Sequence, residues 1–460
     1  MTSPVFHLSR PLSVRGRKPQ GFLSVWCRSL GCPKNRVDTE TLLGSLGAGI
    51  AECRDIRRAD LVFINTCGFI EPAVKESVDA ILEAVRDTEG LKRRPLVAVG
   101  GCVVGRYGIK DLQQEIPEVD LWLATKDLPR WPDMIRERLG LGACAPSGRL
   151  LSGCPSYAWL KVAEGCRHRC AFCTIPAIRG GLRSRPASDI VAEARALLAT
   201  GVRELDLVAQ DLTDYGQDLH PGQEGLPALV RELAGLDGLF WLRLLYLYPK
   251  GITKELLQTV KDAGPVLPYF DIPLQHSHPD VLKRMGRPFD ADPERVCGMI
   301  REALPEAALR TTCIVGYPGE TEAQFEHLCR FVEKTRFTHL GVFTYWPEEG
   351  SKAAELPDQL PQAVKDERRD ALMALQQDIS AQFLEGFRGQ TMDVLVDEAN
   401  PEWPGLHNGR AWFQAPEVDG VTYVSGPGTQ PGAVVCADVE DSGDYDLTAL
   451  AHEPAAGDEA

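Results

Sequence analysis

The sequence lacks an uninterrupted apolar run of about 18 residues, the length that a transmembrane helix needs, so we expect no membrane span. Basic residues are also in short supply: 50 Lys and Arg stand against 65 Asp and Glu, a formal net charge of -15. Such a chain is poorly suited to neutralise phosphates, which argues against non-specific nucleic-acid binding and favours a basic partner. Its 460 residues, 44% of them hydrophobic, are enough for two or three globular domains.

The 14 cysteines lack the short chain and dense spacing of a secreted disulfide framework. Three of them, Cys166, Cys170 and Cys173, are spaced four and then three residues apart after an apolar run. An odd number of thiols cannot all pair as disulfides, and this spacing lets them converge on one metal centre. Zinc usually takes four protein ligands, whereas an iron–sulfur cluster on three thiolates keeps one iron open. Because such ligation needs a reducing compartment, we expect a cytoplasmic protein.

Three further cysteines follow strand-like runs at equal intervals of 35 residues: Cys32, Cys67 and Cys102. Helical patterns over 37–46 and 73–85 lie between these runs. We therefore predict a parallel α/β domain over 21–145. The carboxyl ends of its strands would meet at one edge, where the three thiols form a second ligand set. The alternative is that each is a small buried residue at a strand end. Four other cysteines lack this spacing and are interpreted as structural: Cys27, Cys53, Cys144 and Cys154.

Strand and helix patterns alternate over 152–386, which predicts a partial barrel of six βα units. The expected strands are 157–163, 204–209, 240–248, 269–273, 310–316 and 340–345. The expected helices between them are 187–199, 227–234, 254–263, 293–303 and 322–335. The Cys166 loop follows the first strand, at the end of the barrel where such folds place their chemistry.

Short alternating runs after a connecting helix over 362–387 predict a small β-barrel over 387–450. The expected strands are 391–396, 411–414, 421–424 and 433–437. Over 388–447, two basic residues stand against eleven acidic ones, so this barrel would repel phosphates and suit a basic protein. The alternative is a solubilising surface without a partner. We expect an acidic tail over 451–460. Residues 1–20, with four Lys and Arg and no acid, are expected to be a disordered tail or an over-long start, with a faint likeness to a transit peptide.

Several of these stretches resemble known families. The Cys-x₃-Cys-x₂-Cys spacing, with Phe172 before the last cysteine, resembles the radical S-adenosylmethionine (SAM) enzymes, in which the open iron binds the amino and carboxylate groups of SAM. Residues 29–40 (Ser-Leu-Gly-Cys-Pro-Lys-Asn-Arg-Val-Asp-Thr-Glu), Asn65-Thr66-Cys67 and Gly100-Gly101-Cys102 resemble the methylthiotransferases. The likeness is greatest to the branch that acts on a ribosomal protein, to which 415–420 is also similar. The last barrel resembles a TRAM domain.

This resemblance implies an enzyme that methylthiolates the β-carbon of an aspartate in the twelfth protein of the small ribosomal subunit. It implies two 4Fe-4S clusters and two SAM per turnover. Cys166, Cys170 and Cys173 would hold the cluster that splits one SAM into methionine and a 5′-deoxyadenosyl radical, which takes the β-hydrogen. The same resemblance implies that an auxiliary cluster presents the sulfur and is held by Cys32, Cys67 and Cys102. A second SAM supplies the methyl group. The partners would be the basic ribosomal protein, free or on the ribosome, and an external electron donor; transfer RNA is disfavoured.

The resemblance also implies contacts with SAM, and it assigns no catalytic residue beyond the clusters. Phe172 is expected near the adenine of SAM, and Ile314, Gly316 and Gly319 along it. Gln210 and Asp211 are expected near the amino group, and Arg243 near the carboxylate or ribose. Each has a structural alternative: a salt bridge for Arg243 and a turn with Pro318 for the glycines. His276 fits a structural role equally well. Three arginines after the cysteine loop would either be solvated or bind an acidic substrate side chain or the SAM carboxylate: Arg179, Arg183 and Arg185.

Three other functions stay open. A transfer-RNA adenosine methylthiotransferase would use the same chemistry on another substrate. A non-catalytic iron–sulfur or zinc-binding module would use the cysteines without cleaving SAM. An electron carrier would use both clusters and would also leave SAM intact.

Overall fold

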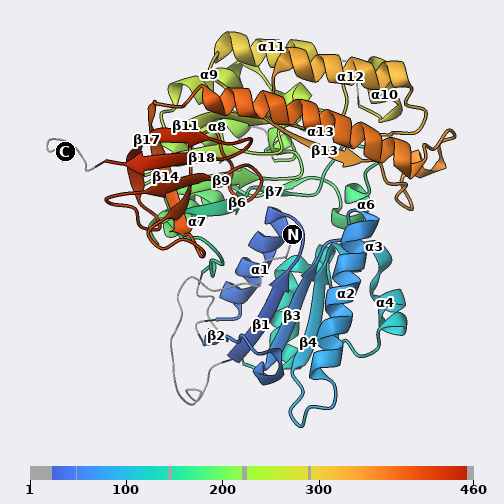
Figure 1. Ribbon diagram of the computed structural model, residues 1–460. Helices are drawn as coiled ribbons and strands as arrows, with labels where there is room; N and C mark the ends of the chain where they lie inside the picture. The colour runs from blue at the N-terminus through green and yellow to red at the C-terminus, as the bar shows by residue number, and fades with distance from the viewer. Residues whose placement is uncertain (1–22, 48, 143–147, 220–224, 288–291, 453–460) are drawn as a thin grey trace. The chain divides into compact units, whose positions relative to one another are not determined.

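The computed structural model describes residues 23–47, 49–142, 148–219, 225–287 and 292–452 (Figure 1). The chain divides into two compact units. The first contains residues 1–153 with 164–168 and 173–181, and the second contains 154–163, 169–172 and 182–460. The tail expected over 1–20, Cys144 and all but two residues of the tail expected over 451–460 lie outside the described residues.

The first unit is built on a five-stranded parallel sheet in the order β2-β1-β3-β4-β5. Its strands are β1 (Leu23–Ser29), β2 (Ile50–Glu52), β3 (Leu61–Thr66), β4 (Leu96–Gly101) and β5 (Leu121–Ala124). The predicted parallel α/β domain is thereby confirmed. Strands β2 and β5 were not predicted, because three or four residues carry too little periodicity to be recognised.

Helices cover both faces of this sheet, as Figure 1 shows in blue. They are α1 (Pro33–Ser45), α2 (Glu71–Thr88), α3 (Cys102–Tyr107), α4 (Ile109–Glu115) and α5 (Trp131–Arg138). The short helix α6 (Ile175–Arg179) of the same unit lies against α3. Alternate residues of β3 serve opposite faces: Val62 and Ile64 pack in one core with Ile81 of α2, while Phe63 packs in the other with Trp131 of α5. In this strand order the winding reverses between β1 and β3. Ligands of such sheets bind outside the carboxyl ends of the strands at that switch point.

The second unit contains a six-stranded parallel sheet whose strands follow one another in chain order, from β6 at one edge to β13 at the other. The strands are β6 (Tyr157–Lys161), β9 (Glu204–Val208), β10 (Trp241–Leu244), β11 (Val266–Asp271), β12 (Ala308–Val315) and β13 (His339–Thr344). The helices are α7 (Ala187–Leu198), α8 (Leu226–Ala234), α9 (Lys254–Asp262), α10 (Pro279–Arg284), α11 (Pro293–Ala303), α12 (Glu322–Thr335) and α13 (Gln362–Glu385). The predicted series of six βα units is confirmed.

Shorter elements complete the described chain. The two short strands are β7 (Ala163–Glu164) and β8 (Arg183–Ser184). The 3₁₀ turns are η1 (Ile56–Arg58), η2 (Thr125–Arg130), η3 (Leu212–Asp214), η4 (Pro249–Gly251) and η5 (Lys352–Glu355). The strand expected over 240–248 ends at Leu244, because Tyr246 takes a φ of 59° and its N–H donates to Asp271 at 3.0 Å.

A closed five-stranded barrel ends the second unit, in the order β14-β15-β16-β18-β17. Its strands are β14 (Thr391–Ala399), β15 (His407–Arg410), β16 (Thr422–Ser425), β17 (Val434–Ser442) and β18 (Leu447–Ala451). The barrel was predicted, but its expected strand over 411–414 was wrong. That segment is a turn whose apolar Phe413 stacks on Phe387 of the preceding connection at 4.8 Å. The true strand, His-Asn-Gly-Arg, has no apolar residue to reveal it.

Within the described residues, the longest helices are too short or too polar to cross a bilayer.

Candidate metal centres

The first candidate site lies in the first unit, at the carboxyl ends of β1, β3 and β4. Cys32 caps α1 after β1, Cys67 follows β3, and Cys102 opens α3 after β4. These three strands are neighbours in the sheet, so their ends share one edge. Gly31 has a φ of +86°, and a Cβ added there would lie 2.9 Å from Sγ of Cys67. Only glycine lets the Cys32 loop approach the Cys67 thiol this closely.

The three thiols influence one another electrostatically. Burial, together with the charges of Cys32 and Cys102, raises the pKa of Cys67 to about 12. Burial also raises the pKa of Cys102, an effect that the charge of Arg179 opposes. Without a metal, Cys67 and Cys102 stay protonated, whereas a bound metal would hold them as thiolates. Three soft thiolate donors at the switch point of a sheet fit an iron–sulfur cluster, and they leave one iron open.

Arg179 is the residue of this site that sequence reasoning missed. The interpretation as a solvated arginine was wrong, because its side chain is 3% exposed. Its Nε donates to Sγ of Cys102 at 3.3 Å, and its Nη1 lies 3.0 Å from carboxylate oxygens of Asp38 and Glu164. Burial alone would lower the pKa of Arg179, but the charges of Glu164, Cys102 and Asp38 outweigh it and raise that pKa. The guanidinium is therefore a fixed positive charge beside a predicted ligand.

The second candidate site is the loop that carries Cys166, Cys170 and Cys173, all of them partly exposed. Cys166 and Cys173 belong to the first unit and Cys170 to the second. The Cys166 N–H donates to the Gly180 carbonyl at 3.1 Å, and a Cβ on Gly165 would lie only 2.1 Å from the Gly181 carbonyl oxygen. This close return of the chain holds the start of the loop. The shared ligation of one cluster stays a prediction from the spacing.

Two residues expected near the SAM adenine meet in the second unit. Phe172 and Ile314 pack against the same buried cluster, which includes Tyr317, Tyr345 and Met285. The neighbouring segment is held by the Ala171 N–H, which donates to the Met285 carbonyl at 2.9 Å. An apolar and aromatic group of this kind can cover a purine face.

The glycines of the following turn have positive φ angles, +72° at Gly316 and +70° at Gly319. A Cβ on Gly316 would lie 2.3 Å from Cγ of Lys365, so this position excludes a side chain. The Gly319 carbonyl accepts from Arg284 at 3.2 Å. Both glycines are thus needed for the turn itself, and their expected contact with the adenine is untested.

Gln210 and Asp211 follow β9, at the carboxyl end where they were expected. Asp211 is buried, and its Oδ1 accepts from the N–H and the hydroxyl of Thr213, at 2.8 and 2.6 Å. These bonds fix the carboxylate at the start of η3. Whether the pair reaches the SAM amino group remains a prediction.

Arg243 lies in the middle of β10 and is fully buried. Its Nε donates to Glu204 at 2.9 Å, and its Nη1 donates to the Trp412 carbonyl of the barrel at 2.8 Å. Asp206, its register partner on β9, lies 3.4 Å away. These contacts favour the salt-bridge alternative, and the expected contact between Arg243 and SAM stays untested. His276 is likewise buried, and its Nδ1 accepts from the His278 N–H.

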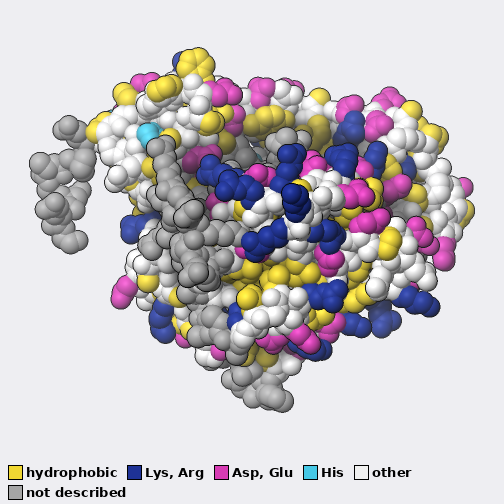
Figure 2. Space-filling view, turned by 90° about the horizontal axis from the view of Figure 1, so that it is seen from below, with side chains coloured by type: hydrophobic (Ala, Val, Ile, Leu, Met, Phe, Trp, Pro, Cys, Tyr) yellow, Lys and Arg dark blue, Asp and Glu magenta, His cyan; other side chains and the backbone are white. Residues whose placement is uncertain are grey.

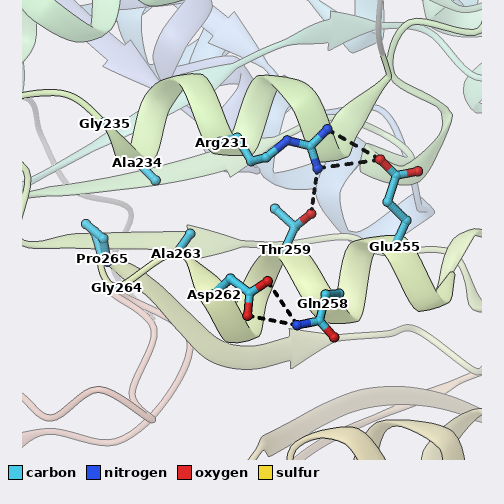
Figure 3. Close-up of a pocket in the computed structure, with 10 residues that line it drawn as sticks. All are labelled: Arg231, Ala234, Gly235, Glu255, Gln258, Thr259, Asp262, Ala263, Gly264 and Pro265. Carbon is cyan, nitrogen blue, oxygen red and sulfur yellow. Dashed lines mark hydrogen bonds and ion pairs between the residues drawn. The ribbon is translucent and has the colours of Figure 1, made fainter.

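A surface pocket of 410 Å³ lies between α8 and α9 (Figure 3). Its polar side chains are already paired: Arg231 donates to Thr259 at 3.0 Å, and Gln258 donates to Asp262 at 2.8 Å. The helix ends that line it lead into the amino-terminal ends of β10 and β11. Chemistry in such sheets lies at the opposite ends of the strands, so we assign no site to this pocket.

Comparison with known proteins adds three family matches that together cover most of the chain. The Radical SAM superfamily matches residues 160–332, the uncharacterized protein family UPF0004 matches 24–124, and the TRAM domain matches 389–451. Among solved structures, the radical SAM methyltransferase TsrM from Kitasatospora setae with tryptophan substrate and a SAM analogue bound has a TM-score of 0.52 at 14% identity, over 87% of this chain and 80% of that one. At that identity the likeness concerns the fold.

Curated relatives are much closer in sequence. "Ribosomal protein uS12 methylthiotransferase RimO" from Nitratidesulfovibrio vulgaris is 58% identical over 94% of this chain and 100% of the relative. The protein of the same name from Oleidesulfovibrio alaskensis is 58% identical over 93% and 100% of the two chains. That from Geobacter sulfurreducens is 44% identical over 91% and 96%. The chain described here therefore belongs to the RimO family of radical SAM methylthiotransferases.

Proposed function

We propose that this protein methylthiolates an aspartate of ribosomal protein uS12 at its β-carbon. The observation that carries the proposal is 58% identity to RimO over the full length of that relative, which spans all three matched domains. The reaction replaces one hydrogen of the substrate with a methylthio group, so the enzyme is a transferase. We place it in the cytoplasm, where thiolate-bound iron survives.

The cysteines divide between two roles. Cys166, Cys170 and Cys173 would hold the 4Fe-4S cluster that the radical SAM family implies, with SAM on its open iron. Three thiols at one edge of the sheet in the first unit would hold a second 4Fe-4S cluster: Cys32, Cys67 and Cys102. When bound, the first cluster would supply the electron that cleaves one SAM, the second would present sulfur, and a second SAM would supply the methyl group. An external one-electron donor would be required, because the reductive cleavage of SAM consumes an electron.

The protein's own side chains would bind and orient SAM. Phe172 and Ile314 offer an apolar face for the adenine, and the Gly316–Gly319 turn offers backbone groups without a Cβ in the way. Gln210 and Asp211 are our candidates for the SAM amino group. Arg243 is the weakest of the expected contacts, since it is engaged by Glu204 and Trp412.

The charge of the last barrel supports a basic protein substrate. Within 388–447, all of which the structure describes, one basic residue, Arg388, is exposed. The exposed acidic residues there are Asp393, Glu398, Glu402, Glu417, Glu440, Asp441 and Asp444. Figure 2 shows a face where Lys and Arg side chains gather, so the net charge of -15 is not spread evenly over the molecule. A locally acidic barrel attracts a Lys- and Arg-rich protein and repels nucleic-acid phosphates.

The test is a competition between substrates. The anaerobically reconstituted enzyme receives a reductant, SAM labelled in its methyl group, purified uS12 and bulk transfer RNA in one reaction. We expect label in uS12 and background label in the RNA, with isolated small subunits as a second form of the substrate. Label in the RNA alone would instead support an adenosine methylthiotransferase. Intact SAM would support a binding module or an electron carrier.

A further inference from the structure

Arg179 has no part in the reaction as proposed so far, yet its buried guanidinium lies 3.3 Å from Sγ of Cys102 in the first candidate site. We infer that Arg179 is a positioning residue for the second cluster: it fixes the Cys102 ligand and raises the reduction potential of the cluster bound there. This inference rests on the proposed function, because it requires a cluster on Cys32, Cys67 and Cys102.

The contacts of Arg179 show how firmly it is held. It is the last residue of α6, and its Nε donates to Sγ of Cys102 at 3.3 Å. Its Nη1 donates to Asp38 of α1 and to both carboxylate oxygens of Glu164, each at 3.0 Å. Its Nη2 donates to Oδ1 of Asn35. A planar guanidinium can satisfy all these acceptors at once because its donors form a rigid fork, which an ammonium cannot reproduce.

Asn35 extends this network to the other two ligand loops. Its Nδ2 donates to the Leu30 carbonyl at 2.7 Å, just before Cys32, and to the Thr66 carbonyl at 2.9 Å, just before Cys67. The amide thereby ties the ends of β1 and β3 together, and its oxygen faces Arg179. Arg179 thus contacts the Cys102 thiol directly, and through Asn35 it is connected to the backbone beside Cys32 and Cys67.

The chemical consequence concerns the charge of the cluster. Reduction adds an electron to a site that already holds three thiolates, so a buried positive charge and an N–H···S hydrogen bond both favour the reduced state. Hydrogen bonds to sulfur and net charge are recognised determinants of iron–sulfur potentials. Asp38 and Glu164 hold the guanidinium in place, and their negative charges offset the free-energy cost of burying its positive charge.

The same arginine belongs to the segment of the radical SAM loop. Glu164 lies two residues before Cys166, and Arg179 lies six residues after Cys173. Both residues belong to the first unit. The segment that would bind the SAM cluster therefore also carries Arg179, so this one segment contributes residues to both predicted cluster sites.

The experiment uses the full-length chain with Cys166→Ala, Cys170→Ala and Cys173→Ala, so that one cluster remains after anaerobic reconstitution. Its midpoint potential is measured by a redox titration followed by electron paramagnetic resonance. In Arg179→Gln we expect the reduced-to-oxidised ratio at a fixed potential to fall at least tenfold, about 59 mV for a one-electron couple. Arg179→Lys keeps the positive charge but loses the planar set of donors. In this variant the reduced-to-oxidised ratio should fall less, and the g-values should be altered. Arg93→Gln is the matched control: it removes an exposed charge before β4, at the opposite end of that strand from Cys102, and should leave the midpoint unchanged.

An unchanged midpoint in Arg179→Gln at equal iron content overturns the inference, and so does an equal shift in Arg93→Gln. If Arg179→Gln loses iron or unfolds, Arg179→Lys decides: a shifted midpoint supports the inference, and a midpoint and g-values identical to those of the parent overturn it. A parent that binds no iron would overturn the proposed second cluster, and the inference with it.

Discussion

Arg410 of the last barrel forms a fully buried ion pair with Glu204, the first residue of β9: Nη1 lies 2.5 Å from Oε2. Asp397 of β14 accepts from the same arginine at 2.7 Å, and Arg243 reaches Glu204 from the other side at 2.9 Å. The charges of Arg410 and Arg243 lower the pKa of Glu204 despite its burial. Within the second unit, this network joins the barrel to the parallel sheet.

Removing the barrel's arginine should therefore destabilise the second unit. In Arg410→Ala, Asp397 loses its cation and the buried Glu204 keeps only Arg243. Breaking a buried pair costs about 3–5 kcal/mol. Urea unfolding of the full chain measures the loss. Arg388→Ala is the control: Arg388 is exposed, its nearest acid is Glu385 at 3.8 Å, and it should cost less than about 1 kcal/mol. Equal losses in the two variants would contradict a stabilising role for the network.

The buried His276 predicts a loss of stability in acid. Burial lowers the pKa of His276 from 6.5 to about 3, so the folded state binds its proton less readily than the unfolded chain. The stabilisation is complete above pH 6.5 and is lost as the pH falls toward 3, by up to about 1.4 kcal/mol per pH unit. His276→Gln should reduce the difference in unfolding free energy between pH 7 and pH 5, whereas the exposed His452→Gln should leave it intact. If His276→Gln left the dependence of the unfolding free energy on pH unchanged, His276 would not be the cause of the loss of stability in acid.

Gly316 tests the expected SAM site. Gly316→Ala places a Cβ where Cγ of Lys365 lies and forces alanine to a φ of +72°. We expect SAM affinity, measured by equilibrium dialysis, to fall at least tenfold while iron content stays constant. Gly298→Ala in α11 is the matched substitution, since nothing lies within 4 Å of its added Cβ. Unaltered SAM binding in a folded Gly316→Ala protein would remove this turn from the site.

The two cysteine triads should fail in different ways. Cys67→Ala should lower the iron content from about eight to about four per chain and still yield 5′-deoxyadenosine from SAM. Cys170→Ala should abolish that cleavage, because its cluster binds SAM. Cys297→Ala, a buried thiol of α11, should alter neither property. The separation of roles would be disproved by full iron content in Cys67→Ala.

The acidic barrel should control binding to uS12 through charge. The triple variant Glu440→Gln, Asp441→Asn and Asp444→Asn removes three exposed negative charges, which should weaken binding and reduce its dependence on salt. Association is measured at several ionic strengths. A control with the same charge change in the first unit combines Asp111→Asn, Glu115→Gln and Glu118→Gln, all exposed. If both triple variants lose the same affinity, overall charge rather than the barrel is responsible.

The sequence was most informative where a residue's role depends on its own neighbours. Cys32, Cys67 and Cys102 follow recognisable strands, so their meeting at one sheet edge could be predicted from the spacing alone. Polar strands were harder: β15 contains His407 to Arg410 and has no apolar alternation, because its barrel face carries a glycine and a buried ion pair.

Roles set by distant partners could not be predicted. Arg179 is one of three arginines that follow the cysteine loop, a pattern typical of a solvent-exposed segment. Its burial depends on Asp38, which lies 141 residues earlier in the chain. From the sequence alone, Arg243 fitted a SAM contact and a salt bridge equally well, and one of its partners, Trp412, lies 169 residues away. Long-range ion pairs leave no periodic signal in a single sequence, so only the folded structure separates them from binding residues.

The most direct measurement of the central claim is the mass of uS12 after an anaerobic reaction with the reconstituted enzyme, SAM and a reductant, followed by fragmentation to locate the change. The account predicts that one methylthio group replaces one hydrogen on an aspartate, and that the Cys67→Ala enzyme leaves the mass of uS12 unchanged although it still cleaves SAM. An unmodified uS12 after demonstrated SAM cleavage by the wild-type enzyme, or a full yield of product from Cys67→Ala, would contradict it.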